Sequence, residues 1–261
     1  MLNTEHPILV MGLLDEASIA CAIGERIEAA GGSVIYTAQN EILTARYLDG
    51  VKRRSMNIRF CDVTSEAAVS ELFDGLPTLG GIVHSIAYAN PKTLLGKEFH
   101  TEAIDDILRS YHTSSVSLAT VTRHAPKRMP SGGSVVAMTF DSSHAYPSYN
   151  WMGVHKAALE AIVRALARRH GRDRIRVNAV SAGPVSTKAS SKIPGFGRLT
   201  ALWNDLSPLP WDPDADKKSV ADTVVFLLGN GSRSITGQVL TVDGGASAMG
   251  DILHDFERRP E

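Results

Sequence analysis

The chain has 261 residues, 43% of them hydrophobic and 21% charged, and its formal net charge is −1. This composition excludes a largely disordered chain, because the apolar content is high enough for a core to offset the loss of chain entropy. A nearly neutral chain gives no indication of nucleic acid or an anionic membrane as a partner.

Short apolar runs alternate with patterns of helical spacing along the chain. We expect strands at residues 7–11, 33–37, 55–61, 81–86, 133–138, 176–180 and 239–242. We expect helices at residues 19–30, 41–54, 64–73, 103–123, 149–170 and 216–229. The strands are apolar throughout rather than alternating, which is typical of a parallel sheet covered on both faces. The pattern predicts an α/β fold: a single doubly wound Rossmann-type domain over residues 1–261, with a central parallel sheet and helices on both faces.

Residues 187–215 are the exception to this alternation. The segment is rich in Ser, Pro and Gly, and it carries the aromatic side chains of Phe196, Trp203 and Trp211. A long irregular segment inside a compact domain usually has a function of its own. We therefore expect a substrate-binding lid at about residues 187–215.

Neither a disulfide framework nor a metal site is predicted. Cys21 and Cys61 lie in apolar stretches, which favours two buried thiols, and the nine histidines show no metal-ligand spacing. No apolar run approaches the ~20 residues of a membrane span, and the polar start of the chain is not typical of a signal peptide. We therefore expect a cytoplasmic protein with no membrane partner.

The first strand leads through a glycine turn into a helix, an arrangement typical of dinucleotide binding. Gly12 permits a tight turn, and Ser18 is a plausible N-cap whose hydroxyl could also donate to a phosphate. Ala20 lets the helix approach closely. The free N–H groups at the start of such a helix can bind a pyrophosphate. The usual pattern of three glycines is missing, so this signal alone is weak.

Two further strand ends bear on the nucleotide. Asp62 follows the third strand, where its carboxylate could accept from an adenine amino group while the Val63 N–H donates. The alternative is an N-terminal cap for the next helix, and the two roles are not exclusive. We expect Thr64 to cap that helix. The second strand ends near Gln39, with no acid to bind ribose hydroxyls and no base to neutralise a 2′-phosphate; Arg46 is the nearest. This favours NADH over NADPH.

Tyr149 and Lys156 are seven residues apart on the predicted helix 149–170. Seven residues return almost to the same helix face and rise ~10 Å along the axis. A tyrosine hydroxyl beside an ammonium can donate a hydrogen bond to a developing oxyanion. The alternative is a tyrosine at a helix start and a solvated lysine.

Taken together, these motifs resemble the short-chain dehydrogenase/reductase superfamily, and within it the divergent enoyl-acyl-carrier-protein reductase branch. The resemblance rests on the turn from Gly12 to Ala20, the run from His84 to Ala87, Tyr149-x6-Lys156, and residues 181–187 and 242–245. Residues 138–141 and 149–152 are most similar to the actinobacterial, isoniazid-target type.

The resemblance implies hydride transfer from NADH to C3 of a trans-2-enoyl thioester of acyl-carrier-protein or CoA, in a homotetramer. Tyr149 would stabilise the enolate and Lys156 would bind the nicotinamide ribose. Substrate contacts are implied for Phe140, Tyr88, Tyr146 and Tyr149, although Phe140 could equally be a core residue. The implied cofactor-binding residues are Gly12, Ser18, Ile19, Gln39, Asp62, Val63, Ser85, Ile86, Ala87, Lys156, Pro184, Val185 and Thr187.

Two alternatives stay open. A carbonyl reductase of the same superfamily would have tyrosine four residues before the lysine, and that position is Met152, which supplies no proton. A non-catalytic NAD-binding homologue would not need both Tyr149 and Lys156. The segment 187–215 carries Lys188 and Lys192 where the family is more apolar, which leaves the substrate open more than the chemistry.

Overall fold

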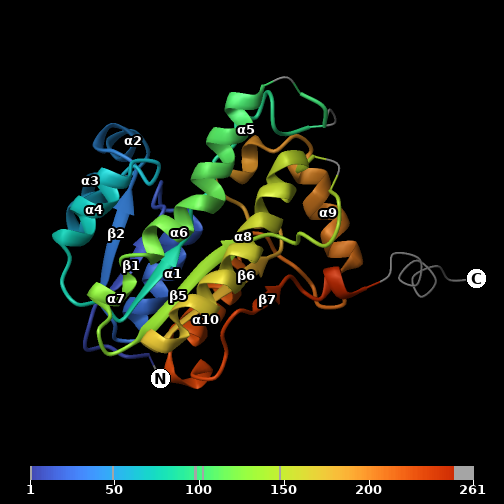
Figure 1. The fold of residues 1–261 in the computed structure, drawn as a ribbon. Coiled ribbons are helices and arrows are strands. Elements are labelled where there is room, and N and C mark those ends of the chain that lie inside the picture. The colour runs from blue at the N-terminus through green and yellow to red at the C-terminus, as the bar shows by residue number, and fades with distance from the viewer. Residues whose placement is uncertain (1, 49, 97–98, 102, 147, 250–261) are drawn as a thin grey trace, which may run out of the picture.

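The computed structural model describes residues 2–48, 50–96, 99–101, 103–146 and 148–249. Seven strands form one parallel sheet, as the sequence predicted (Figure 1). Their order, which the sequence pattern did not predict, is β3-β2-β1-β4-β5-β6-β7. The order reverses between β1 and β4, so the carboxyl ends of these strands border a crevice where doubly wound folds bind ligands. The strands are β1 (Ile8–Met11), β2 (Val34–Ala38), β3 (Ile58–Phe60), β4 (Gly81–His84), β5 (Gly133–Thr139), β6 (Ile175–Ala182) and β7 (Val239–Val242).

Helices cover both faces of the sheet because successive side chains of each central strand point to opposite faces. Along β1, Ile8 and Val10 pack in one core, and Leu9 and Met11 pack in the other. The first core is closed by α1 (Ile19–Ala29) and α10 (Lys217–Leu228). The second is closed by α4 (Glu66–Asp74), α6 (Ser117–Thr122) and α8 (Asn150–His170). The predicted doubly wound architecture is confirmed.

The two edge strands differ from the expectation of fully buried strands. Side chains of β3 and β7 are half-buried or exposed, because each edge strand lacks a neighbour on one side. The third strand is also shorter than the predicted 55–61. Its predicted first residue, Ser55, is the last residue of α3 (Gly50–Ser55), and the strand itself begins at Ile58. The predicted helix 41–54 is wrong as one unit. Its first part, α2 (Glu41–Tyr47), ends where Leu48 adopts an extended backbone.

The predicted helix 103–123 follows a longer and less regular path. It is made of α5 (Ile104–Tyr111), a π-helical turn η1 (His112–Val116) and α6, followed by the short unpredicted α7 (Ala125–Arg128). Ser18 caps α1 as predicted. The cap predicted for Thr64 is wrong by one residue: Ser65 accepts from the Ala68 N–H at 3.2 Å, while Thr64 donates back to Asp62. The remaining short helices are η2 (Gly171–Asp173), η4 (Asn230–Ser232) and η5 (Ala246–Ala248).

Residues 187–215 are more ordered than the irregular segment that we expected. They contain η3 (Ser190–Lys192) and a helix of 11 residues, α9 (Phe196–Leu206), which projects beyond the sheet beside the start of α8 (Figure 1). Trp203 on α9 is buried, and its indole N–H donates to the Asp243 carbonyl at 2.9 Å. The helix therefore forms against a distant part of the chain, which the local composition of the segment does not reveal.

Cys21 and Cys61 are both buried, as predicted, and neither takes part in a disulfide. Within the described residues, no helix is long and apolar enough to cross a membrane. Nor do those residues contain a cluster of three or more His, Cys, Asp or Glu side chains suited to a metal ion.

Candidate functional site

The turn after β1 is held between two neighbouring strand ends. The N–H groups of Gly12 and Leu13 donate to the Thr37 carbonyl of β2 at 3.1 and 2.9 Å. Gly12 has a φ of +99°, and a Cβ built there would lie 2.1 Å from the Ser85 carbonyl oxygen beyond β4. Only glycine fits such a backbone against such a neighbour. The turn is thereby fixed at the crevice between β1 and β4.

Ser18 joins this turn to α1. Its hydroxyl accepts from the Cys21 N–H at 3.3 Å and donates to the Asp15 carbonyl at 2.7 Å. N–H groups in the first turn of a helix lack intrahelical acceptors, and the helix dipole adds partial positive charge there. A glycine cradle followed by such a helix start fits the diphosphate of a dinucleotide.

Asp62 lies beyond the end of β3 with its carboxylate already partly engaged. One oxygen accepts from the Thr64 N–H and hydroxyl at 2.9 and 2.7 Å, and the other lies 3.4 Å from the Gln39 amide nitrogen. Burial alone would raise the pKa of Asp62, but the hydrogen bonds from Thr64 and Gln39 outweigh it and lower the pKa. Asp62 is therefore part of the turn before α4, and this position does not conflict with the predicted contact to an adenine amino group.

Tyr149 and Lys156 mark the start of α8. Tyr149 is the N-cap residue, and burial raises the pKa of its hydroxyl above the ordinary value. Lys156 is 4% exposed, and its ammonium donates to the Met138 carbonyl at 2.9 Å. Burial lowers the pKa of Lys156 to about 8, against the opposing effect of Glu160. At neutral pH the pair therefore consists of a protonated phenol and a buried ammonium.

Three of the predicted substrate residues lie together. The Phe140 ring centroid is 4.8 Å from that of Tyr149 and 4.9 Å from that of Tyr146, and Trp203 of α9 lies 5.8 Å from Phe140. The Tyr146 hydroxyl donates to the Asp141 carboxylate at 2.8 Å. An aromatic cluster of Phe140, Tyr146, Tyr149 and Trp203 thus forms beyond β5, and it links the site to the segment 187–215.

Tyr88, the fourth predicted substrate residue, stands apart from this aromatic cluster. Its ring lies 5.1 Å from the Arg109 guanidinium, and its backbone is held by Ser110 and Ser114 beside the π-helical turn. Ser85 and Ile86 connect it to β4, and Ile86 also contacts the Gly12 turn.

The loop after β6 is anchored by Trp211. The indole N–H donates to the Pro184 carbonyl at 2.8 Å, and a Cβ at Gly183 would lie 2.8 Å from the same ring. Ser190 then holds Thr187: its hydroxyl accepts from the Thr187 N–H at 2.9 Å and bonds to the Val185 carbonyl at 2.9 Å. Pro184, Val185 and Thr187 are therefore in fixed positions at the carboxyl edge.

Sequence reasoning missed two acidic groups at the site. Glu160 accepts from the hydroxyls of Thr139 and Ser142 at 2.9 and 2.6 Å, on the helix that carries Lys156. Its spacing of four from Lys156 was the available signal. Asp15, buried in the turn after β1, has no such signal. His155, the residue before Lys156, is buried and its ring nitrogen lies 3.0 Å from the Ser110 hydroxyl.

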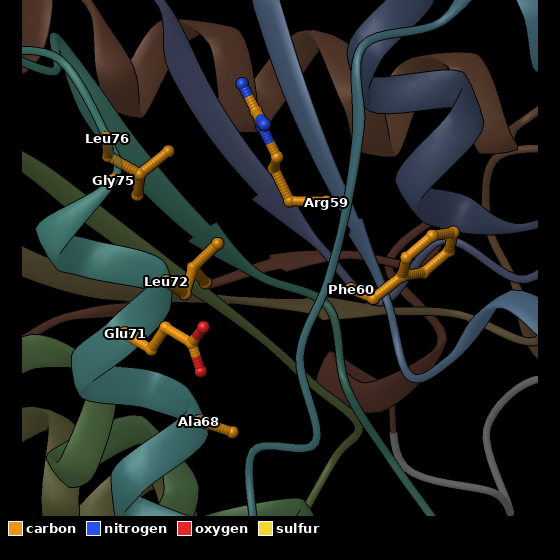
Figure 2. A pocket seen from close by; sticks show the side chains of 7 residues that line it. All are labelled: Arg59, Phe60, Ala68, Glu71, Leu72, Gly75 and Leu76. Carbon is orange, nitrogen blue, oxygen red and sulfur yellow. The ribbon is translucent and has the colours of Figure 1, made fainter.

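Of two surface hollows in the described part of the chain, one is remote from this arrangement and the other borders it. One, of about 240 Å³, separates Arg59 and Phe60 on the edge strand β3 from Glu71 and Leu72 on α4 (Figure 2). The other, of about 210 Å³, lies between Glu160 and β7. The first is remote from Tyr149 because β3 and β5 are separated by three strands of the sheet.

The candidate site has two parts with different chemistry. A glycine turn and helix start suited to a diphosphate lie at β1, and a phenol donor with a buried ammonium lies at the start of α8. An apolar aromatic surface flanks the phenol, so a substrate whose oxygen develops negative charge could be bound with its apolar part against the rings.

Comparison with known proteins gives a consistent result. The family described as "Enoyl-(Acyl carrier protein) reductase" matches residues 12–247. The NADH-dependent enoyl-[acyl-carrier-protein] reductase FabI of Bacillus subtilis is 36% identical over 246 residues, covering 91% of this chain and 94% of that protein. The FabI of Staphylococcus aureus, named as using NADPH, is 33% identical over 258 residues, covering 95% of this chain and all of that protein.

A solved structure agrees with these relatives. The enoyl-acyl carrier protein reductase of Bacillus cereus, in complex with NADP⁺ and indole naphthyridinone, superimposes with a TM-score of 0.87 at 32% identity. It covers 95% of this chain and 98% of that one. These relatives do not test the finer resemblance to the actinobacterial type, which stays a prediction. The chain belongs to the enoyl-(acyl carrier protein) reductase family of the short-chain dehydrogenase/reductase superfamily.

Proposed function

We propose that the protein reduces the C2=C3 double bond of a trans-2-enoyl thioester, carried on acyl-carrier-protein or CoA, with NADH as the reductant. The observation that carries this proposal is the Tyr149 phenol, kept protonated by burial, at the edge of the aromatic cluster and seven residues before the buried Lys156. Family membership supports the same reaction.

The cofactor is held, in this proposal, by the residues predicted from the sequence. The Gly12 turn and the start of α1, with Ser18 and Ile19, receive the diphosphate, and Asp62 with Val63 receives the adenine. Lys156 receives the nicotinamide ribose. The other contacts come from Gln39, Ser85, Ile86, Ala87, Pro184, Val185 and Thr187. Gln39 carries no charge for a 2′-phosphate, which supports NADH.

Bound NADH supplies a hydride to C3 of the substrate. Negative charge then develops on the thioester oxygen, and the Tyr149 hydroxyl donates a hydrogen bond to that oxygen. The Lys156 ammonium lowers the electrostatic cost of the developing anion on the same side of α8. Phe140 and Tyr146 bind the acyl part. A proton taken from solvent would add to C2 of the enolate and complete the reduction.

Met152 argues against a carbonyl reductase. It stands four residues before Lys156, where such enzymes have their tyrosine, and it is 3% exposed with the Ser110 hydroxyl 3.5 Å from its sulfur. A thioether has no acidic proton to give to a ketone oxygen. A non-catalytic role is disfavoured because the buried Lys156 is costly to retain without a use.

Residues 187–215 act in this proposal as the lid of a single domain. Trp203 and Trp211 anchor the segment, while α9 brings Trp203 to the aromatic cluster. Such a lid closes over the acyl chain and keeps water from the reacting carbons.

A homotetramer in the cytoplasm completes the proposal. Helix α8 exposes a stripe of small apolar side chains, Val154, Ala157, Ala161 and Ala165, spaced so that they share one face. Ile104 and Leu108 on α5 are also more than half exposed. A second copy packed on these helices would bury both sets. Light scattering behind size-exclusion chromatography tests the tetramer, and a monomer would refute it.

The test of function is NADH consumption with crotonyl and trans-2-decenoyl thioesters on CoA and on acyl-carrier-protein. Acetoacetyl thioester and NADPH serve as controls. The proposal expects NADH loss with enoyl but not with 3-oxoacyl thioesters. If NADH binds and only 3-oxoacyl thioesters are reduced, the carbonyl-reductase alternative replaces it. Binding of NADH without any turnover would favour the non-catalytic homologue.

A further inference from the structure

Lys188 lies at the start of the lid segment and reaches back over the phosphate turn. Its ammonium is 3.8 Å from a carboxylate oxygen of Asp15 and 4.3 Å from the centre of the Tyr47 ring. After the other end of the segment, the Lys217 ammonium donates to the Ala17 carbonyl at 2.8 Å. Two lysines thus connect both ends of the lid segment to the turn at residues 12–18.

Asp15 is an unusual group for a diphosphate-binding turn. It is only 6% exposed, and one of its carboxylate oxygens is buried without a hydrogen-bond partner in the described structure. A buried carboxylate repels a diphosphate that binds a few ångströms away, since both are anionic and the surroundings screen charge poorly. A turn with Asp15 therefore needs a cation nearby before it can bind a dinucleotide tightly.

We propose that Lys188 is a cofactor-positioning residue of the lid, whose ammonium offsets the Asp15 carboxylate and binds the diphosphate of the dinucleotide. This inference rests on the function proposed above for the same site. It couples the lid to the cofactor, because the residue that neutralises the phosphate turn belongs to the segment that closes over the substrate. In this arrangement the Lys188 ammonium lies between the Asp15 carboxylate and the diphosphate of the cofactor.

The geometry of Lys188 leaves room for this second contact. A distance of 3.8 Å is a charge contact rather than a hydrogen bond, so the three donors of the ammonium stay available. The side chain is 43% exposed, and the ammonium stands on a flexible chain of four carbons. The ammonium can therefore move toward an anion while the backbone of the loop stays in place. The Tyr47 ring also makes a cation–π contact with the Lys188 ammonium.

Lys192 offers a matched control. It has the same charge and lies on η3 of the same segment, but it is exposed, and within the described residues no ion pair joins it to Asp15. A general effect of positive charge on the lid would make Lys192→Met as harmful as Lys188→Met. The proposal expects Lys188→Met to weaken the binding of NADH and Lys192→Met to leave it unchanged.

The experiment measures dissociation constants for NADH, ADP-ribose and adenosine by calorimetry. The variants are Lys188→Met, Lys192→Met, Asp15→Asn and the double variant Asp15→Asn/Lys188→Met, each checked for folding by its melting temperature. We expect Lys188→Met to weaken NADH and ADP-ribose binding about tenfold, because one charge contact to the diphosphate is lost. Adenosine, which lacks phosphate, should bind Lys188→Met as it binds the wild type.

The double variant separates charge compensation from a structural latch. Removing the Asp15 charge should restore most of the affinity that Lys188→Met loses, and Asp15→Asn alone should bind NADH at least as tightly as the wild type. If Asp15→Asn and Lys188→Met weaken binding equally and the double variant recovers nothing, the pair is only a latch and the proposal is overturned. Unchanged NADH affinity in Lys188→Met also overturns it.

The outcomes also separate this inference from the proposed function. A wild type that binds NADH and reduces enoyl thioesters, with an unaffected Lys188→Met, refutes only the role of Lys188. A wild type that binds NADH through Lys188 but reduces no enoyl thioester refutes the proposed reaction and leaves the role of Lys188 intact.

Discussion

Gly12 and Ser85 are positioned by the sheet, whereas Tyr146 and Trp203 are positioned by aromatic rings. The Gly12 N–H donates to Thr37 of β2, and the Ser85 N–H donates to Met11 of β1, both at 3.1 Å. The rings of Tyr146 and Trp203 instead contact the Phe140 ring and each other, at centroid distances of 4.9, 5.8 and 5.7 Å. Backbone hydrogen bonds hold a residue in place almost regardless of its side chain, but ring contacts depend on every partner. We therefore expect the cofactor end of the site, at Gly12 and Ser85, to tolerate side-chain changes better than the acyl end, at Phe140, Tyr146 and Trp203.

The largest effect is expected at the acyl end, from Tyr149→Phe. This change removes only the hydroxyl and keeps the ring against Phe140. Loss of one donor to a developing oxyanion lowers turnover by about 10²- to 10³-fold. The NADH dissociation constant should stay within about twofold, because the turn at β1 is untouched. Steady-state kinetics and a calorimetric titration measure the two quantities; a full rate would show that another group stabilises the enolate.

Gly12→Ala tests the one place where the cofactor end should not tolerate a side chain. The new methyl group would meet the Ser85 carbonyl at 2.1 Å, and φ is +99°. We expect a loss of about 3 kcal/mol in the free energy of unfolding, from overpacking and backbone strain. Gly197→Ala on α9 is the control, since nothing lies within 4 Å of its added methyl group. Urea denaturation compares both; equal stability of the two variants would contradict the close approach at Gly12.

Lys156 is proposed to bind the cofactor but lies on α8, the helix that begins at Tyr149. The pH dependence of NADH affinity tests its role. Because burial lowers its pKa from 10.5 to about 8, the ammonium is lost as pH rises through that value. If the ribose needs the ammonium, NADH affinity should fall by about tenfold per pH unit above about 8. In Lys156→Met this slope should be absent. Fluorescence titration of NADH between neutral and alkaline pH distinguishes a slope from a flat profile.

The same group predicts the sign of a stability change in the free protein. The unfolded chain holds its lysine proton up to about 10.5, and the folded chain releases it near 8. Between these values the unfolded state binds more protons, so the free energy of unfolding should rise with pH. Lys156→Met lacks this contribution. A wild type that loses stability relative to the variant over this interval would refute the buried ammonium.

The smallest effect is expected from Trp211→Phe beside the loop after β6. The change removes the hydrogen bond to the Pro184 carbonyl and the part of the indole that lies nearest Gly183. The lost hydrogen bond contributes about 1 kcal/mol to the expected fall in the free energy of unfolding, the usual net contribution of one such bond. Trp151→Phe is the control, because its bond to the Phe99 carbonyl is exposed. Equal losses in the two variants would show that burial of the bond does not matter.

Much of the cofactor end could be predicted from the sequence. The strand pattern predicted the parallel sheet, and Ser18 was correctly predicted as the cap of α1. Tyr149 and Lys156 were found from their spacing on one helix. These features depend on neighbours in sequence: hydrophobic periodicity, a cap and a helix repeat all act within a few residues. The same local rules missed the break at Leu48 and predicted a helix cap at Thr64, one residue before the observed cap at Ser65.

The sequence by itself determined the alternation of strands and helices, the glycine turn and the Tyr149–Lys156 pair, because each is encoded by residues close together in the chain. The tertiary structure alone decided that residues 187–215 contain α9, that Trp203 joins the aromatic cluster, and that Lys188 meets Asp15. Each of these depends on contacts between distant segments, whose formation balances packing and charge against the entropy of closing a long loop. No local pattern reports that balance.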